Sequence, residues 1–233
     1  PVGTETTAAR DAGQAGDNVI SAPEATSGVT LTGKAEAGAS VAVTLEGTTR
    51  TVTADAQGNW SADFASSEIP TGEYDANVSV TATDALGNTA STTGTVRVDT
   101  ETEVALSNPL AGDNLINAVE ANNGLDLTGT AEAGASVVVQ LGNATRTVTA
   151  NAQGQWTASF AGSDIADGTY DTTVTATATD AYGNTASASS QIHVDTTTSV
   201  GLDNGQAGGD DVLNGAEAAG GLTLTGTAEA GAS

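Results

Sequence analysis

The stretch YDANVSVTATD, residues 74–84, decides the fold because an apolar or small side chain stands at every second position. These positions are Tyr74, Ala76, Val78, Val80 and Ala82. Side chains of a β-strand alternate between its two faces, so the pattern predicts a strand with one buried face. The segment DALGN that follows combines Asp, Gly and Asn, which are typical of tight turns. We therefore predict a long half-buried strand that ends in a hairpin turn.

The same period of two appears in shorter runs on both sides of this stretch. These runs are Val41, Val43 and Leu45; Trp60, Ala62 and Phe64; and Val96 with Val98. Turn-rich segments such as AEAGAS and ADAQGN separate them, and no helical period is present. About seven short strands in roughly a hundred residues predict an all-β, antiparallel sandwich of immunoglobulin type. Trp60 is the predicted core anchor, and Tyr74 stands where a tyrosine corner is found.

The whole pattern recurs one domain length later. Trp60 and Trp156 are 156 − 60 = 96 residues apart, and Tyr74 and Tyr170 keep the same spacing. LTGKAEAGAS at residues 31–40 likewise returns as LTGTAEAGAS at 127–136 and again at 224–233. The chain is therefore predicted to be a tandem array. Its predicted parts are repeat 1 at residues 1–98, repeat 2 at 99–194 and a partial third repeat at 195–233.

Residues 195–233 would supply the first two strands of a third unit. Leu222 and Leu224 would face inward there, with nothing from this chain to cover them. A two-stranded element is marginally stable in water by itself. We expect the cover to come either from further sequence of a longer chain or from strands of a neighbouring copy, as in donor-strand assemblies.

Composition limits the partners that the chain can bind. Five Lys and Arg against 29 Asp and Glu give a formal net charge of −24. Nucleic acids and anionic lipids need basic patches, so neither is an expected partner, whereas cations are. There is no cysteine, and no apolar stretch is long enough to cross a bilayer, so direct membrane insertion is not expected. The first residues, PVGTETTAAR, do not form a signal peptide, and we interpret the chain as an excerpt.

The sequence contains few residues that could support catalysis. The single histidine, His193, lies between Ile192 and Val194, which are expected to point inward, so His193 is expected to point outward. No cysteine or second histidine is available for a triad, and no phosphate loop or zinc pattern is present. We therefore predict that the protein is not an enzyme.

The candidate functional residues of the sequence are carboxylates in acidic loops. In a sandwich of this topology, linker residues Asp99 and Glu101 should face the second unit, while the first unit approaches the same linker from below. The second unit contributes Glu132, Asp180 and Asn184, and the first contributes Asp17 and Glu24. Converging hard oxygens without a nearby Lys or Arg favour Ca²⁺, which takes six to eight oxygen ligands. Acidic loop ends that are merely solvated are the alternative, and spacing alone does not separate the two.

The corresponding positions of the other units complete the set of candidate ligands. They are Asp84, Asp113, Glu120 and Asp195.

The segments GDNLINAVEA, LTGTAEAGAS, GQWTASF, DGTYDTTVTATATDAYGNTA and VDT occur in this order. They resemble the bacterial Ig-like repeats of giant Gram-negative surface adhesins, which support biofilms and leave the cell by type I secretion. The resemblance implies an extracellular, calcium-binding stalk at the cell surface, with its adhesive ligand outside this segment, and it favours calcium over solvated loops. The chain departs from the pattern at Gly3, because the equivalent positions of the later units are the aspartates Asp99 and Asp195. It also lacks the usual proline after VDT.

Three functions fit these observations to different degrees. The first is a stalk segment whose junctions are stiffened by Ca²⁺ and whose partners are neighbouring repeats. The second is a filament or surface-layer subunit in which copies of the protein associate through shared domains. The third is a carbohydrate-binding module, for which an exposed aromatic platform is typical. Only Tyr182 is a candidate for such a platform, and its counterpart in repeat 1 is Leu86.

Overall fold

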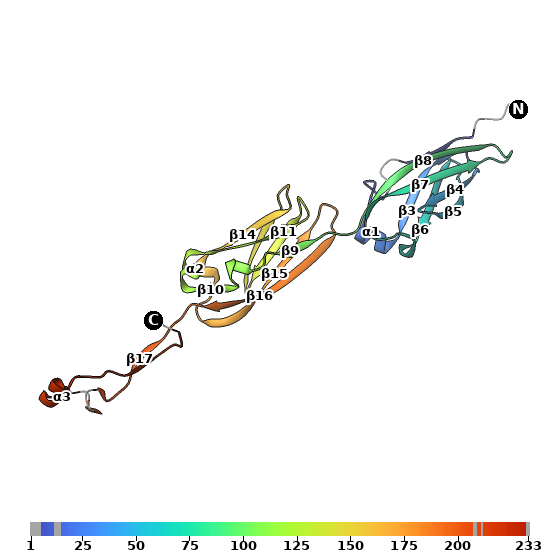
Figure 1. Cartoon of the computed structure of the whole chain (residues 1–233). Coiled ribbons are helices and arrows are strands. Elements are labelled where there is room, and N and C mark those ends of the chain that lie inside the picture. Colours follow the sequence, from blue (N-terminus) through green and yellow to red (C-terminus); the bar gives the residue numbers. More distant parts are fainter. Residues whose placement is uncertain (1–5, 12–14, 207–208, 211, 232–233) are drawn as a thin grey trace.

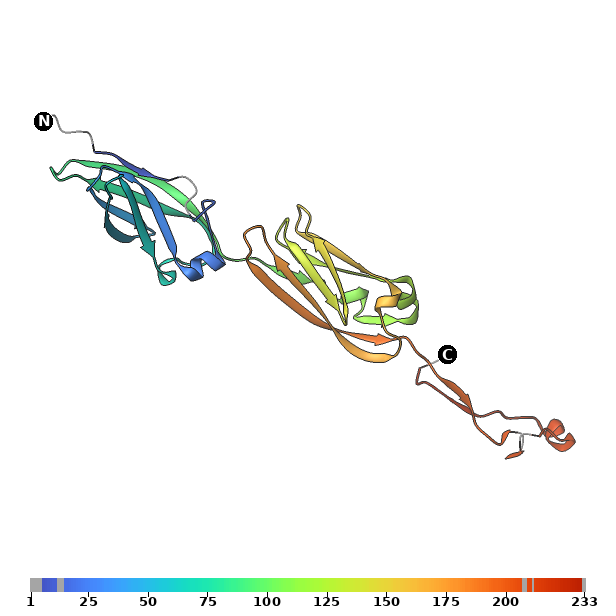
Figure 2. The ribbon, with the colours of Figure 1, turned by 180° about the vertical axis from the view of Figure 1, so that it is seen from behind.

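The computed structural model describes residues 6–11, 15–206, 209–210 and 212–231. The molecule is elongated, with two β-sandwiches arranged end to end and a thin two-stranded extension after the second (Figure 1). The view from behind gives the same arrangement, with the red segment that contains α3 at the end farthest from the first sandwich (Figure 2). The predicted all-β fold with tandem sandwiches is confirmed.

The first sandwich consists of two sheets. The larger has the strand order β2-β8-β7-β4-β5, and the smaller has the order β1-β3-β6. Its elements are β1 (Ala8–Arg10), β2 (Val19–Ser21), α1 (Ala22–Ser27), β3 (Val29–Ala35), β4 (Ser40–Leu45), β5 (Thr48–Thr53), β6 (Asn59–Phe64), η1 (Ser66–Glu68), β7 (Glu73–Thr83) and β8 (Thr89–Asp99).

The second sandwich repeats this arrangement, with sheets ordered β10-β16-β15-β12-β13 and β14-β11-β9. Its elements are β9 (Val104–Leu106), η2 (Leu110–Gly112), β10 (Leu115–Asn117), α2 (Ala118–Asn123), β11 (Leu125–Ala131), β12 (Ser136–Leu141), β13 (Ala144–Thr149), β14 (Gln155–Phe160), η3 (Gly162–Asp164), β15 (Thr169–Thr179) and β16 (Thr185–Asp195).

One pairing in each sandwich is parallel. In the first, β2 runs beside β8, with Ile20 opposite Val98 and Ser21 opposite Asp99. The last residue of the sandwich therefore lies beside the start of α1, and the C-terminal end of the first unit is built from both segments.

The predicted core anchors are buried between the sheets. Trp60 and Trp156 each keep 2% of their surface exposed, and the alternating Val, Ala and Leu residues pack around them. The repeated LTG segment explains how such a large ring fits. A Cβ atom on Gly33 would lie 2.3 Å from the Trp60 ring, and one on Gly129 would lie 2.2 Å from the Trp156 ring. Glycine is therefore required opposite each tryptophan.

Both tyrosine corners are present. The hydroxyl of Tyr74 donates to the carbonyl of Pro70 at 2.9 Å, and that of Tyr170 donates to the carbonyl of Ala166 at 2.9 Å. These bonds hold the loop before β7 and β15 against the start of the long strand.

Short helices stand where the sequence shows no helical period. In α2, the Asn117 side chain accepts from the amides of Val119 and Glu120, and the Glu120 carboxylate accepts from the Asn117 amide in return. In α1, the Glu24 carboxylate accepts from the Ser21 amide in the same way. Each helix has six residues, too few for an amphipathic period to be visible, so capping rather than periodicity determines them.

The third segment forms a two-stranded extension. Strand β17 (Val200–Leu202) pairs with β18 (Gly226–Ala228), and α3 (Gly215–Gly220) lies between them in the chain. Leu222 and Leu224, expected to face inward, are exposed in the described chain. They have the apolar character of a core face without the sheet that would cover it.

Candidate metal centre

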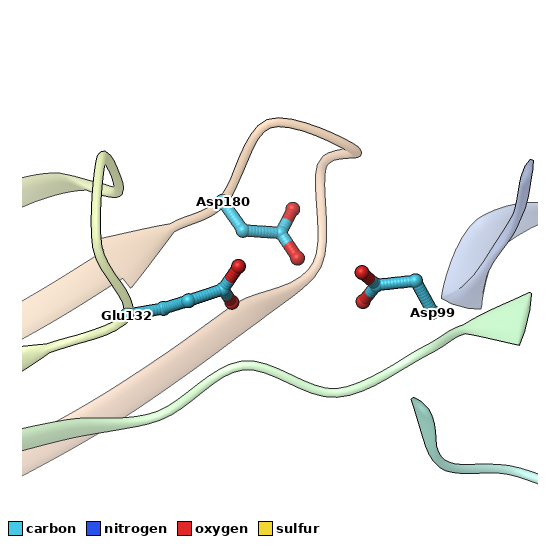
Figure 3. Close-up of side chains that lie close together, drawn as sticks. All are labelled: Asp99, Glu132 and Asp180. Atoms are coloured by element: carbon cyan, nitrogen blue, oxygen red, sulfur yellow. The ribbon is translucent and has the colours of Figure 1, made fainter. Parts of the chain in front are cut away.

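Three carboxylates from two units converge at the first junction. Asp99 ends β8, Glu132 lies in the turn between β11 and β12, and Asp180 follows β15. One oxygen of each lies within 4.8 Å of the other two, and among the described residues this is the group that has the geometry to hold a metal ion. Figure 3 shows the three side chains pointing toward a common space from three different segments.

The hairpin turn DAYGN holds Asp180 in place. Its Oδ1 accepts from the backbone amides of Tyr182 at 2.8 Å and Asn184 at 2.9 Å. Two amide donors fix the carboxylate plane, so Asp180 meets the junction in a preset orientation. The second oxygen, Oδ2, accepts from the Asn184 side chain at 2.6 Å.

Burial and mutual repulsion act on Asp99. Desolvation raises its pKa above the ordinary aspartate value, and the charges of Glu73 and Asp180 add to this effect. Without a bound cation, the ionised form of Asp99 is therefore less favoured at this position than in water.

Glu132 is in the same situation. Desolvation raises its pKa, the charges of Asp180 and Asp99 raise it further, and the neighbouring Thr102 hydroxyl offsets part of the change. Its Oε2 atom is buried and has no hydrogen-bond partner. A buried carboxylate oxygen without a donor costs free energy unless something else binds it.

The expectation that no Lys or Arg lies near the carboxylates is wrong, because Arg97 lies near Asp99. The charge of Arg97 lowers the pKa of Asp99, although more weakly than burial and the neighbouring carboxylates raise it. Arg97 also contacts Glu73 at 3.3 Å, so its charge is shared between two carboxylates. The arginine comes near because it is two residues before Asp99 on the same strand.

The structure places the other candidates of this junction outside the group of three. Asp17 accepts from the Val19 amide, and Glu24 accepts from the Ser21 amide and hydroxyl, so both serve local turns and caps. Glu101 is exposed on the linker. Asn184 adjoins the cluster and is buried, with its side-chain nitrogen donating to Asp99 as well as to Asp180.

The counterparts in the other units occupy equivalent positions. Asp84 holds the hairpin turn of repeat 1, while Asp113 and Glu120 accept from the amides of Leu115 and Asn117 in repeat 2. Asp195, the counterpart of Asp99, lines a pocket at the second junction together with Glu229.

Thr102 is a residue of the site that sequence reasoning missed. Its Oγ1 atom is buried without a hydrogen-bond partner and lies beside Glu132. A signal was available, because Thr6, Thr102 and Thr198 are also spaced by 96 residues. Each stands three residues after Gly3, Asp99 or Asp195. A hydroxyl oxygen is a suitable neutral ligand for a hard cation.

His193 points outward, as predicted. It is exposed, and its Nδ1 lies 2.7 Å from the carboxylate of Asp171 on the neighbouring strand. Ile192 and Val194 on either side are buried. A solvated cross-strand pair is a sufficient explanation for this histidine. Within the described residues, no helix is both long and apolar enough to cross a bilayer.

The comparison with protein families gives a match over most of the chain. A model described as a bacterial Ig-like domain matches residues 1–100 and 107–196. These two ranges correspond to the two sandwiches. No curated protein matches the chain.

Two solved structures are similar over almost the full length. One is described as a Ca²⁺-stabilized adhesin that helps an Antarctic bacterium reach out and bind ice; it is 34% identical, has a TM-score of 0.52, and the match covers 97% of this chain and 57% of that one. The other is from a 1.5-MDa bacterial ice-binding adhesin; it is 28% identical, has a TM-score of 0.55, and the match covers 97% of this chain and 77% of that one. The chain thus spans little more than half of the first structure, and its structural neighbours are repeats of large bacterial adhesins.

Proposed function

Because the chain belongs to the bacterial Ig-like domain family, we propose that it is a segment of the extracellular stalk of a large bacterial adhesin. The function of such a segment is mechanical, namely to hold an adhesive domain away from the cell surface. The elongated arrangement of two sandwiches end to end supports this proposal (Figure 1). The solved structures that it resembles come from large adhesins.

Calcium is the cofactor that we propose for the first junction. The donor set consists of the three carboxylates of Asp99, Glu132 and Asp180, with the Thr102 hydroxyl beside them. All are hard oxygens, as Ca²⁺ prefers, and water can complete its six to eight ligands. The observation that carries the proposal is the buried, unpartnered oxygen of Glu132 within a group of carboxylates from two units.

A cation at this point supplies the positive charge that the three carboxylates lack. With the charges compensated, Asp99 of the first unit and Glu132 and Asp180 of the second are held together rather than driven apart. The linker from residue 100 to residue 103 then has less freedom to bend. The junction therefore becomes stiffer, which is what a stalk requires.

The partners that we propose are the neighbouring repeats of the same kind. A filament of associating copies remains a second assembly for the same domains. A carbohydrate-binding role has weaker support, because Tyr182 is 41% exposed and stands in the hairpin turn beside the junction rather than on an open platform.

Calcium binding and its effect on the junction can be measured together. We expect millimolar calcium to raise the free energy of unfolding by about 1 kcal/mol per site, given affinities of about 10⁻⁴ to 10⁻³ M for extracellular modules. X-ray scattering should give a larger maximum dimension in calcium than in chelator. The Glu132→Gln variant, which keeps the size of the side chain, should lose most of the calcium response. Identical scattering and melting of the parent protein in calcium and chelator would contradict the proposal.

A further inference from the structure

The turn that carries Asn184 is formed in the same way in both units. In repeat 1, the Asp84 carboxylate accepts from the Leu86 amide, the Asn88 amide and the Asn88 side chain, at 2.8, 2.8 and 2.7 Å. In repeat 2, Asp180 makes the same three bonds with Tyr182 and Asn184. The geometry therefore does not depend on a preceding unit, and the asparagine side chain is held in position before any contact between units is made.

In repeat 2, the asparagine also reaches into the first unit. The Asn184 side-chain nitrogen donates to the backbone carbonyl of Asp99 at 2.9 Å and to its carboxylate at 3.1 Å. Its Oδ1 accepts from the backbone amide of Ala22 at 2.8 Å. Ala22 is the first residue of α1, where backbone amides have no partner within the helix.

These bonds are shielded from water. Asn184 keeps 2% of its surface exposed, whereas its counterpart Asn88 is exposed. Docking removes these polar atoms from water, and the hydrogen bonds across the junction offset that desolvation cost. A docked orientation that broke the bonds would leave buried polar atoms unsatisfied.

Two attachment points determine orientation better than one. Ala22 begins α1 and Asp99 ends β8, and the two segments lie side by side because Ser21 pairs with Asp99. A single bond to the linker would let the second unit rotate about it. A second bond to a neighbouring segment removes that rotation, and because the turn is already rigid, little conformational entropy is lost on docking.

We propose that Asn184 is a latch that sets the relative orientation of the two units by itself, before any cation binds. It does so by joining Ala22 and Asp99 of the first unit to Asp180 of the second. Calcium then compensates the negative charge and further restricts bending about the orientation that Asn184 already favours. Asn184 is thus a positioning residue of the junction, and its effect is present in chelator.

The first test uses Asn184→Ala, with Asn88→Ala as the matched control. Both variants remove the same bond within the hairpin turn, but only Asn184 has partners in another unit. The chain has no cysteine, so spin labels can be attached at Ser61→Cys on β6 and Thr157→Cys on β14, one in each unit. In chelator, we expect a broader distance distribution for Asn184→Ala and an unchanged one for Asn88→Ala. Equal distributions for Asn184→Ala and the parent would overturn the latch.

The second test removes the amide on the other side. Ala22→Pro deletes the donor at a position of the helix where proline is favoured, and Ser21 already has the extended backbone that precedes proline. Ala118→Pro, at the start of α2, is the control, since no asparagine side chain among the described residues accepts from that amide. We expect Ala22→Pro to broaden the distribution and Ala118→Pro to leave it unchanged. Equal effects of the two prolines would argue that the helix start, rather than the latch, is responsible.

Amide exchange gives a readout that does not need labels. In chelator, the Ala22 amide should exchange about fivefold faster or more in Asn184→Ala than in the parent, a factor that corresponds to one ordinary hydrogen bond. Unchanged protection of this amide would also overturn the latch.

Different results would contradict the latch and the calcium site. If calcium has no effect on the parent but Asn184→Ala broadens the distribution, the latch holds and the calcium proposal is wrong. If calcium narrows the distribution of the parent and Asn184→Ala matches the parent in chelator, the calcium site holds and the latch is wrong.

Discussion

The faces at the N-terminal ends of the two sandwiches are made of the same residues and behave differently. Repeat 1 has Thr6, Glu36, Asp84 and Asn88, and repeat 2 has Thr102, Glu132, Asp180 and Asn184. Asn88 is exposed, whereas Asn184 is buried. In repeat 1, the Thr6 hydroxyl donates to the Asp84 carboxylate at 3.1 Å, whereas the Thr102 hydroxyl is buried without a partner.

The electrostatics of the two faces differ accordingly. Hydrogen bonds from Asn88 hold the pKa of Asp84 below the ordinary aspartate value. Across the first junction, desolvation and neighbouring carboxylates raise the pKa of Asp99 and of Glu132. The Asp84 turn of repeat 1 is thus satisfied by its own hydrogen bonds, and at the first junction Asp99, at the end of the preceding unit, completes the group of three carboxylates.

The tryptophan cores should be the same in both units. Trp60→Ala and Trp156→Ala should each lower the free energy of unfolding by about 3 to 5 kcal/mol, because each leaves a large cavity between the sheets. Chemical denaturation of each variant checks this. A much smaller loss for one of the two would break the equivalence of the sandwiches.

Calcium should affect the two faces differently. Asp99→Ala should remove most of the calcium-dependent stabilisation of the first junction, about 1 kcal/mol at millimolar calcium. Asp84→Ala should change it little, because Asp84 belongs to no group of three converging carboxylates among the described residues. Melting curves of both variants in calcium and in chelator measure the difference. Equal losses of the calcium response would mean that the two faces bind alike.

The arginines on β5 and β13 should act equally in both units. Arg50 donates to the Asp63 carbonyl and pairs with Glu68, and Arg146 does the same with Ser159 and Asp164. Each also lies over a phenylalanine ring, at 5.7 Å from Phe64 and 5.1 Å from Phe160.

Because these charges are partly exposed, the ion pairs contribute little by themselves. Arg→Ala should therefore cost about 1 kcal/mol in either unit, with much of the loss coming from the ring contact and the backbone hydrogen bond. Denaturation in chelator is the measurement, and a clear inequality between Arg50→Ala and Arg146→Ala would count against this account.

The smallest expected effect is a difference in titration between the two faces in chelator. A raised pKa means that Asp99 and Glu132 favour the junction in their protonated form, a contribution that is lost as the pH rises through their raised pKa values. Asp84 has a lowered pKa, so its contribution is lost as the pH falls through that value. Mild acidification should therefore tighten the junction.

Carboxyl carbon shifts measured by NMR give the titration midpoints. We expect the Asp99 midpoint above about 3.9, the ordinary aspartate value, and the Asp84 midpoint below it. Coinciding midpoints would show that the second unit does not change the environment of Asp99.

Several features could be predicted from the sequence because they depend on short-range patterns. The period of two identified the strands, the Gly, Asn and Asp segments identified the turns, and the spacing of 96 identified the tandem array. Sandwich topology was then enough to predict that Asp99, Glu132 and Asp180 would meet, since it determines which loops share an end. The short helices were missed because six residues with a capping box leave no period.

Tertiary structure alone decided which oxygens are left without a donor. Asp17 and Glu24 carry the same charge as the three clustered carboxylates, but nearby backbone amides bind them. The Glu132 Oε2 and Thr102 Oγ1 atoms are buried without a hydrogen-bond partner, and Asn184 gains Ala22 as a partner because α1 begins beside the end of β8. The sequence by itself determined the strands, the turns and the acidic residues, because local backbone preference and side-chain alternation encode them. The junction depends on the path of a four-residue linker and on the water that it excludes, and neither is encoded locally.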